Sequence, residues 1–565
     1  MQRAIQERQE DVKIGWFERN VIVCIHISNS RICILHISTL VGKHCATMTV
    51  EALLNDAEIL IVGAGPSGLV LALCLAKLGV TFRIVEKSSG PGQASRAIAV
   101  QARILEFYRQ LGFAEEVVNG GLKMERLHLR KGSREIAALQ FGDFGKNLSA
   151  FPFVLSYPQD VHEKLLIEKL VAVGIEVEWN TELVDFADDG KRVRVTLRSQ
   201  GVEEISEVGF LCGCDGAHSR VRQGLNLTFP GGTYEQRFFV ADVEETGAPV
   251  QGDINICMGV DAFCLVFPIR SVKQDRLIGI VPKELADREN VTFDDIRAYV
   301  EKLAGVKVHK VNWFSTYHIH HRVAERFRVG RVFIAGDAGH VHSPVGGQGM
   351  NTGIGDAVNL AWKLAAVIQS RADASILDTY ESERIAFARS LVATTDRLFQ
   401  EIVGRGLGAY MFRNFVFPVL LPLALKFSSG RKTQFRLISQ IRINYRQSAL
   451  SEGIAGEIHG GDRLPWLGGL AGDNFEVLNS NDWQVHVYGE AQAAMRDIAA
   501  NHEIPLHMFT WNAAARAAGL SKDAAYLVRP DGHVALADSK QDADSLERFL
   551  ARFKIKARAT SRSSK

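Results

Sequence analysis

The stretch EILIVGAGPSGLVLALCLAKLG, residues 58–79, decides the fold of this chain. Its first five residues form a short, mostly apolar run, which is typical of a buried parallel strand. The apolar residues after the glycine-rich turn predict a buried helix that ends at a glycine. In such a turn Gly63 allows the tight bend, Gly65 lets a pyrophosphate approach the backbone, and Gly68 lets the helix pack on the strand. The stretch therefore predicts a unit that holds a dinucleotide phosphate at a helix N-terminus.

A second strand and an acidic residue complete this unit. Residues 82–85 predict the strand, which ends at Glu86, about 20 residues past the glycines, where a ribose hydroxyl needs an acceptor. A glycine-rich turn without a ligand is the alternative interpretation. The presence of strand, turn, helix, second strand and acid in order favours dinucleotide binding.

Composition limits the class of protein. A length of 565 residues is too great for one compact core and predicts several domains. The formal net charge of +2 gives no reason to expect nucleic acid as a partner. The eight cysteines are scattered without a CxxC pair, so we expect no disulfide framework, no metal site, and reduced thiols in a cytoplasmic protein.

Two apolar stretches are poor candidates for membrane spans. The stretch at residues 21–41 is interrupted by polar residues, and residues 415–425 are too few and contain two prolines, so no transmembrane segment is predicted. We expect residues 1–47 to be an extension that is disordered or a non-native start, because Met48 opens a natural-looking start ahead of the first strand.

Two further motifs follow buried-strand patterns. They are CDGAHSRVR at residues 214–222 and AGDAGHVHSPVGGQGMN at residues 335–351. Between them, residues 229–317 alternate between polar and apolar side chains, which predicts a second sheet inserted between the two motifs.

These three motifs, in this order and at this spacing, resemble those of the flavoprotein aromatic hydroxylases. This family comprises the single-component (group A) flavoprotein monooxygenases typified by para-hydroxybenzoate hydroxylase and phenol hydroxylase. The resemblance covers residues 57–389 in motif order. The segments GDRLPW at residues 461–466 and AYLVRPDGHVAL at residues 525–536 resemble the thioredoxin-like domain of the phenol-hydroxylase branch. No cysteine follows Cys264, so dithiol chemistry is excluded in that domain.

The resemblance implies an α/β fold, with a Rossmann-type FAD-binding domain, an inserted β-rich substrate domain, a helical linker and a C-terminal thioredoxin-like domain. The expected boundaries are an extension at 1–47, the first segment of the FAD-binding domain at 57–228, the substrate domain at 229–325, the second segment of the FAD-binding domain at 326–400, the linker at 401–452, the thioredoxin-like domain at 453–555 and a basic tail at 556–565.

The resemblance also implies roles for single residues around FAD. Residues expected at the pyrophosphate and the adenosine side are Gly63, Gly65, Ser67, Gly68, Glu86 and Arg96; those expected at the ribityl chain and flavin ring are Gln159, Asp337, Gly347, Gly349, Met350 and Asn351. Asp215 and Gly216 resemble a fingerprint of the family that is implicated in FAD binding. Asp215 and Gly216 are also implicated in NAD(P)H binding, and Arg96 in nicotinamide docking. Alternative interpretations are a surface cation for Arg96 and a turn aspartate for Asp337.

The substrate side is less well defined by the sequence. Pro344 resembles the proline whose carbonyl lines that side, and Phe267 and Pro268 are candidate wall residues for which a plain core strand is an equal alternative. No catalytic residue is identified, but one of Tyr317, His320 or His342 could help to deprotonate a phenol.

The implied reaction is hydroxylation of a phenolic or polyketide-type aromatic ring through a flavin C4a-hydroperoxide. FAD would be bound non-covalently, with NAD(P)H and O2 as cosubstrates, a small aromatic molecule as substrate, and a homodimer as a candidate assembly. The alternatives on the same scaffold are a flavin epoxidase and an oxidative decarboxylase or ring-cleaving monooxygenase. An alternative of another class is a non-catalytic flavin-binding interaction protein.

Overall fold

A computed structural model describes most of the chain. The described residues are 57–92, 97–140, 144–259, 262–269, 271–343, 347–403, 411, 428–468 and 472–558, together with the backbone of the strands β1 (Ile14–Phe17), β2 (Val21–Ser28) and β3 (Arg31–Thr39). These three strands form a sheet of their own within the predicted extension 1–47, whose origin as a non-native start stays a prediction.

A six-stranded sheet in the order β11-β5-β4-β15-β22-β21 forms the centre of the molecule. All neighbours are parallel except β21 and β22. Its strands are β4 (Ile59–Val62), β5 (Phe82–Glu86), β11 (Glu178–Trp179), β15 (Phe210–Gly213), β21 (Arg328–Val329) and β22 (Val332–Ile334). This mostly parallel sheet with its helices confirms the predicted α/β class.

The helix that follows β4 begins at a proline and ends at a glycine. Helix α2 (Pro66–Leu78) begins three residues before the apolar run, because Pro66 fits the first helical position, and ends at Gly79 with φ +71°. Helix α2 packs against α5 and α8. The helices of this region are α3 (Ala102–Leu111), α4 (Ala114–Gly120), α5 (Gln159–Ala172), α6 (Arg220–Gly224) and α8 (Gly349–Ile368), with the short 3-10 helices η2 (Gly336–Ala338) and η3 (Ala374–Leu377).

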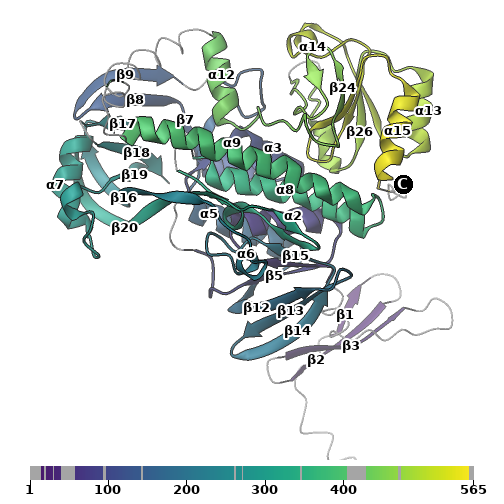
Figure 1. Ribbon diagram of the computed structural model, residues 1–565, viewed down its shortest axis with the longest axis horizontal. Coiled ribbons are helices and arrows are strands. Elements are labelled where there is room, and N and C mark those ends of the chain that lie inside the picture. Colours follow the sequence, from purple (N-terminus) through teal and green to yellow (C-terminus); the bar gives the residue numbers. More distant parts are fainter. Residues whose placement is uncertain are drawn as a thin grey trace, which may run out of the picture.

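An eight-stranded sheet in the order β23-β20-β16-β19-β18-β17-β8-β9 lies beside the parallel sheet (Figure 1). Helix α7 (Phe293–Ala304) packs on one face of it, against β17, β18 and β20. Its strands are β8 (Arg126–Lys131), β9 (Arg134–Gln140), β16 (Gly231–Gly247), β17 (Ile254–Met258), β18 (Phe263–Ile269), β19 (Ser271–Ile280), β20 (Val306–Val323) and β23 (His340–Val341), with η1 (Lys283–Leu285) after β19. Strands β8 and β9 come from the range predicted as the first segment of the FAD-binding domain, so this sheet extends beyond residues 229–325, and the domain boundaries stay a prediction.

Two small sheets complete this half of the molecule. One has the order β6-β10-β7 and the other the order β12-β13-β14. Their strands are β6 (Ala99–Val100), β7 (Leu122–Met124), β10 (Val154–Ser156), β12 (Thr181–Asp188), β13 (Val193–Ser199) and β14 (Val202–Val208).

A C-terminal sheet in the order β25-β24-β29-β28-β26-β27 packs near the end of the long helices α8 and α9 (Figure 1). The predicted strand–turn–strand at residues 525–536 is confirmed, since β28 and β29 pair antiparallel across Gly532, which has φ +75°. The thioredoxin-like assignment stays a prediction. The elements are α9 (Asp378–Val403), α12 (Ser428–Ile438), β24 (Glu452–Ala455), β25 (Ile458–His459), η5 (Glu476–Ser480), β26 (Gln484–Tyr488), α13 (Ala493–Asn501), β27 (Leu506–Phe509), α14 (Ala513–Ala517), β28 (Ala525–Val528), β29 (Val534–Asp538) and α15 (Ala543–Phe553).

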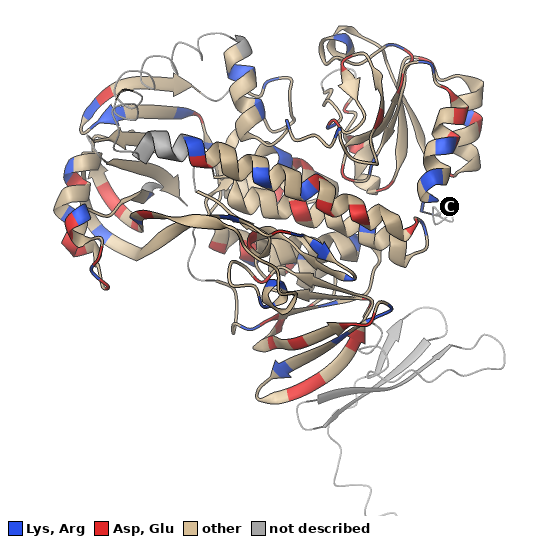
Figure 2. Cartoon of the chain, viewed as in Figure 1, with Lys and Arg blue, Asp and Glu red and all other residues tan. Residues whose placement is uncertain are grey.

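Charged residues of both signs are interspersed along the described chain. Figure 2 shows Lys and Arg beside Asp and Glu on α7, α9 and α15, in keeping with the small formal net charge. Among the helices that the structure describes, none is long and apolar enough to cross a membrane, and residues 415–425 lie outside the described residues.

Two acidic side chains are buried together in the eight-stranded sheet. Glu245 on β16 is 6% exposed and Asp275 on β19 is 4% exposed. Burial, followed by the charge and the hydrogen bond of Asp275, raises the pKa of Glu245 to about 7. Burial also raises the pKa of Asp275 to about 6. Because carboxyl groups of an unfolded chain titrate near about 4, the folded protein keeps protons that the unfolded chain has already lost.

This pair predicts that stability falls as pH rises from about 4 through 7, where the folded carboxyls ionise. We expect Glu245→Gln to raise the Tm at pH 8.5, by about 2–4 °C per kcal/mol where the cooperative unit that unfolds has about 150–250 residues, and to change it little at pH 5. The neighbouring variant Glu244→Gln is the control, because Glu244 is partly exposed and pairs with Lys310. Thermal unfolding across pH checks this, and equal pH profiles for both variants would contradict it.

Candidate functional site

The three motifs begin at the same edge of the parallel sheet. The amide of Gly63 donates to Val85 O at 2.8 Å, and the amide of Cys214 donates to Val62 O at 2.7 Å. The amide of Ala335 donates to Gly213 O at 2.9 Å. The strand ladder thus continues directly into the motifs, and ligands of such sheets bind at this carboxyl edge.

The three glycines of the first motif differ in what surrounds them. Gly63 has φ +103°, and a Cβ there would clash with Cys214 O, while a Cβ on Gly68 would clash with Gly63 O. A Cβ on Gly65 would meet no protein atom within 4 Å. Gly63 and Gly68 therefore serve the packing of the turn, whereas Gly65 faces open space at the N-terminus of α2, where a pyrophosphate fits.

Ser67 joins the first motif to the third. A Cβ on Gly336 or on Gly353 would collide with Ser67 Oγ, so this side chain lies in the seam between α2, η2 and α8. Its backbone, in the first turn of α2, is the group that could meet a phosphate.

Glu86 holds the glycine-rich turn from the neighbouring strand. Its Oε2 accepts from the Ala64 amide at 3.0 Å, and its Oε1 accepts from Ser88 N at 3.0 Å and Ser88 Oγ at 2.8 Å. The acid therefore lies at the turn, and its role at the ribose stays a prediction.

Asp215 has one oxygen bound and one available. Its Oδ2 accepts from the amides of Arg220 at 2.6 Å and Val221 at 3.1 Å at the start of α6. Its Oδ1 is buried and has no hydrogen-bond partner among the described residues. Burial raises the pKa of Asp215. A buried acceptor beside Gly216, which has φ +78°, fits a hydroxyl donor from a ligand.

The third motif ends in the N-terminus of the 20-residue helix α8. Asn351 ties this end to β6: its Oδ1 accepts from Gln101 N at 2.8 Å, and its Nδ2 donates to Ala99 O at 2.9 Å and Gly347 O at 2.8 Å. The side chain of Asn351 is thus used internally, which leaves the backbone of Met350 and Asn351 for a ligand. The positive end of α8, opened by Gly349, favours negative charge on a group placed there.

The structure describes some of the other predicted site residues and leaves others out. Asp337 lies exposed on η2, close to the seam made by Ser67. Gln159 begins α5, accepts from Ala97 N at 3.2 Å and donates to Glu163 at 2.8 Å. Arg96 and Pro344 lie outside the described residues.

The predicted wall residues are buried at the junction between the sheets. Phe267 is 6% exposed and packs in a cluster with Ile98 and Met124, on the face of the sheet opposite α7. Pro268 O accepts from Ser156 Oγ at 2.7 Å. Both residues lie in a core strand, and a substrate-wall role stays a prediction.

The three candidates for phenol activation have different surroundings. The Tyr317 ring lies 6.1 Å from that of Phe238, and His320 Nδ1 contacts Thr233 Oγ1 at 2.7 Å. His342 Nδ1 contacts Ser343 O at 2.8 Å, while its buried Nε2 lacks a partner within the described stretches of the chain. Burial lowers the pKa of His342 to about 4, so the ring is neutral near pH 7. Such a ring can accept a hydrogen bond, but it is too weak a base to take a proton fully from a phenol.

A buried charge cluster behind the site was missed by sequence reasoning. Asp356 on α8 accepts from Gly336 N at 3.0 Å, from His340 Nε2 at 2.7 Å and from Arg384 Nε at 2.6 Å. Although burial acts in the opposite direction, the Arg384 and His340 charges hold the pKa of Asp356 below its ordinary value. The sequence signal was an acid inside a helix of mostly apolar residues, which also contains Asn359 and Lys363.

The described residues fit FAD. The open space at Gly65, the unsatisfied Asp215 Oδ1 and the positive end of α8 lie along one edge and match a phosphate, a hydroxyl and an electron-rich ring. No group of three or more His, Cys, Asp or Glu among the described residues could hold a metal ion.

Comparison with known proteins agrees with this geometry. Residues 56–395 match the family described as FAD binding domain, and residues 472–554 match the family described as aromatic-ring hydroxylase, C-terminal. The chain is 34% identical to 6-methylpretetramide 4-monooxygenase of Streptomyces rimosus over 418 residues, which is 71% of this chain and 72% of that protein. It is 29% identical to a flavin-dependent monooxygenase of Mycobacteroides abscessus over 84% of this chain and 96% of that one.

A solved structure, the OxyS anhydrotetracycline hydroxylase from Streptomyces rimosus, is similar with a TM-score of 0.71 and 27% identity. The similarity covers 88% of this chain and 98% of that one. The match over residues 56–395 includes all three motifs. The chain therefore belongs to the FAD-dependent aromatic-ring hydroxylases, a family of flavin-dependent monooxygenases.

Proposed function

We propose that this enzyme hydroxylates a phenolic or polyketide-type aromatic ring, with NAD(P)H and O2 as cosubstrates. The observation that carries the proposal is the meeting of three distant motifs at one sheet edge, with an open cradle at Gly65. Two of the relatives described above are named as a 6-methylpretetramide monooxygenase and an anhydrotetracycline hydroxylase, which supports a polyketide-type substrate.

The chain's own groups would hold FAD without a covalent bond. The backbone around Gly65 and the N-terminus of α2 would bind the pyrophosphate, and Glu86, Asp215 and Asp337 would accept hydroxyls of the sugar and the ribityl chain. Bound FAD supplies the activation of oxygen. The N-terminus of α8 would favour negative charge at the ring edge, because helix N-termini carry partial positive charge.

The aromatic substrate would lie between α8 and the face of the eight-stranded sheet opposite α7. Asn351 of α8 donates to Ala99 O of β6, and Ser156 of β10 donates to Pro268 O of β18. Because β6 and β10 are neighbours in one small sheet, these contacts hold the two surfaces together. Of the three candidates, His342 is best suited to orient a substrate hydroxyl, since its buried Nε2 lies near Gly349 at the start of α8. Its low pKa supports hydrogen bonding and not proton removal.

We place the enzyme in a reducing cytoplasm. The described cysteines Cys74, Cys212, Cys214, Cys257 and Cys264 are all buried and unbridged, which agrees with thiols that stay reduced. A homodimer and the absence of a nucleic-acid partner stay predictions.

Purified protein with FAD should oxidise NAD(P)H faster when a suitable phenol or polyketide aromatic is added, and the product should gain one oxygen atom. Parallel assays of NAD(P)H absorbance and product mass check this. If FAD binds tightly and no aromatic compound gains oxygen, the non-catalytic flavin-binding alternative is favoured.

Gly65→Ala separates cofactor binding from folding. Because its Cβ meets no protein atom within 4 Å, the variant should keep the Tm of the FAD-free protein. The methyl group would intrude on the pyrophosphate, so we expect FAD affinity to fall by about 10-fold or more. Gly68→Ala is the contrasting variant and should unfold at lower temperature, since its Cβ clashes with Gly63 O. Unchanged FAD affinity in Gly65→Ala would contradict the placement of the pyrophosphate at Gly65.

Asp337→Ala should weaken FAD retention because a charge-assisted hydrogen bond, worth about 1.5–3 kcal/mol, is lost. This corresponds to roughly 10- to 150-fold in affinity. Asp497→Ala, at an exposed position of α13, is the matched control. Flavin content after gel filtration gives the answer, and equal retention in the two variants would refute the role of Asp337.

A further inference from the structure

Helix α9 carries two adjacent buried charges that face different regions of the molecule. Glu383 is 4% exposed and Arg384 is 1% exposed. Arg384 contacts the flavin-side helix α8, and Glu383 contacts the C-terminal domain. The two residues therefore join regions that are far apart in the chain.

Arg384 reaches the third flavin motif through Asp356. Its Nε donates to Asp356 Oδ1 at 2.6 Å, and its Nη2 donates to Thr352 O at 3.0 Å in the first turns of α8. The other oxygen of Asp356 accepts from the amide of Gly336, the residue before Asp337. A shift of Arg384 would therefore move the turn that presents Asp337.

Glu383 is held by the C-terminal domain. Arg529 donates to both of its oxygens, at 2.8 and 3.0 Å, in a bidentate ion pair. Lys363 of α8 donates to Glu383 Oε2 at 2.8 Å, and Arg529 also donates to Asp531 at 2.6 Å. Arg529 is fully buried, so these two carboxylates balance a positive charge that water does not reach.

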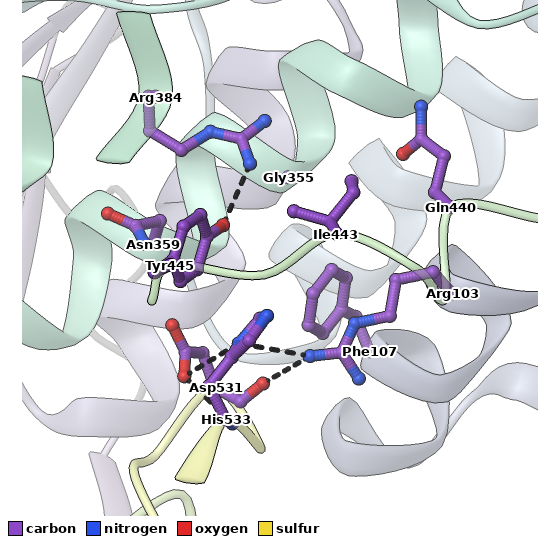
Figure 3. A pocket seen from close by; sticks show the side chains of 10 residues that line it. All are labelled: Arg103, Phe107, Gly355, Asn359, Arg384, Gln440, Ile443, Tyr445, Asp531 and His533. Carbon is purple, nitrogen blue, oxygen red and sulfur yellow. Dashed lines mark hydrogen bonds and ion pairs between the residues drawn. The ribbon is translucent and has the colours of Figure 1, made fainter. Parts of the chain in front are cut away.

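Tyr445 connects both sides of this cluster. Arg384 Nη1 donates to Tyr445 Oη at 2.8 Å, and the Tyr445 ring lies 4.4 Å from that of His533 in the C-terminal domain. Figure 3 shows Tyr445 between Arg384 and the pair Asp531 and His533, around a small cavity at the domain junction. The phenol group thus braces Arg384 from the side opposite the flavin motif.

A cluster of buried charges is not the contact between two domains that contributes most to the free energy of unfolding. An apolar contact of similar volume is often as stable or more stable, because ions lose their hydration when buried. What paired charges do supply is fixed geometry, since each bidentate contact sets position and orientation. The cluster is therefore better explained by positioning than by stability.

We propose that the C-terminal domain and the linker segment before it position the flavin site, with Arg529 of that domain and Tyr445 of the linker as positioning residues. They hold Arg384 and Glu383 on α9, and through Asp356 they set the turn at Gly336 and Asp337 against FAD. The inference rests on the proposed placement of FAD at that turn.

Tyr445→Phe tests this by removing one hydroxyl. We expect the dissociation constant for FAD, measured by fluorescence titration of the full-length protein, to rise about 3- to 10-fold, the range of one buried hydrogen bond. Tyr488→Phe is the matched control: its hydroxyl is also buried but accepts from Asn474 within the C-terminal domain. The Tm of Tyr488→Phe should fall by a similar amount, and its dissociation constant for FAD should stay unchanged. Equal FAD affinities in the two variants would overturn the proposal.

A double-mutant cycle with Asp337→Ala gives a second readout. If Tyr445 acts through the turn, the FAD losses of Tyr445→Phe and Asp337→Ala should be less than additive. Strict additivity would overturn the route through Gly336 while leaving the proposed function intact. Loss of the proposed function would instead show as absence of FAD binding in the unaltered protein.

Discussion

Parallel pairing of β5, β4, β15 and β22 is the constraint on which the rest of the structure depends. It places the ends of strands that are separated by long stretches of chain at one edge, as parallel strands must. The close approach of Gly63 to Cys214 and of Gly336 to Ser67 then leaves no room for side chains other than hydrogen at these glycines. A cradle for a dinucleotide follows from that packing.

Much of the first unit could be predicted because its signals are local. The strand at residues 59–62, the helix after the glycines and the acid at Glu86 each depend on neighbouring residues in the chain. The recruitment of β8 into the eight-stranded sheet could not be predicted, since its pairing of Leu127 with Ile254 joins distant segments without a local pattern. For the same reason the contact of Asp356 with Arg384 was invisible in the sequence.

The buried charges explain how domains with separate sheets act together. Polar contacts join Gly336 to Asp356 and Asp356 to Arg384, and others join Glu383 to Arg529 of the C-terminal domain. The two sets meet at α9, where Glu383 and Arg384 are adjacent in the chain. A cysteine-free C-terminal domain needs no redox chemistry of its own in this arrangement. Its contacts act on the flavin site by fixing the position of α9.

The most direct measurement of the central claim is a crystal structure of the protein grown with FAD. The account predicts the pyrophosphate against Gly65 at the start of α2, and the flavin ring edge at the backbone of Met350 and Asn351. Density for FAD at any other place, or a flavin ring directed away from the N-terminus of α8, would contradict the account.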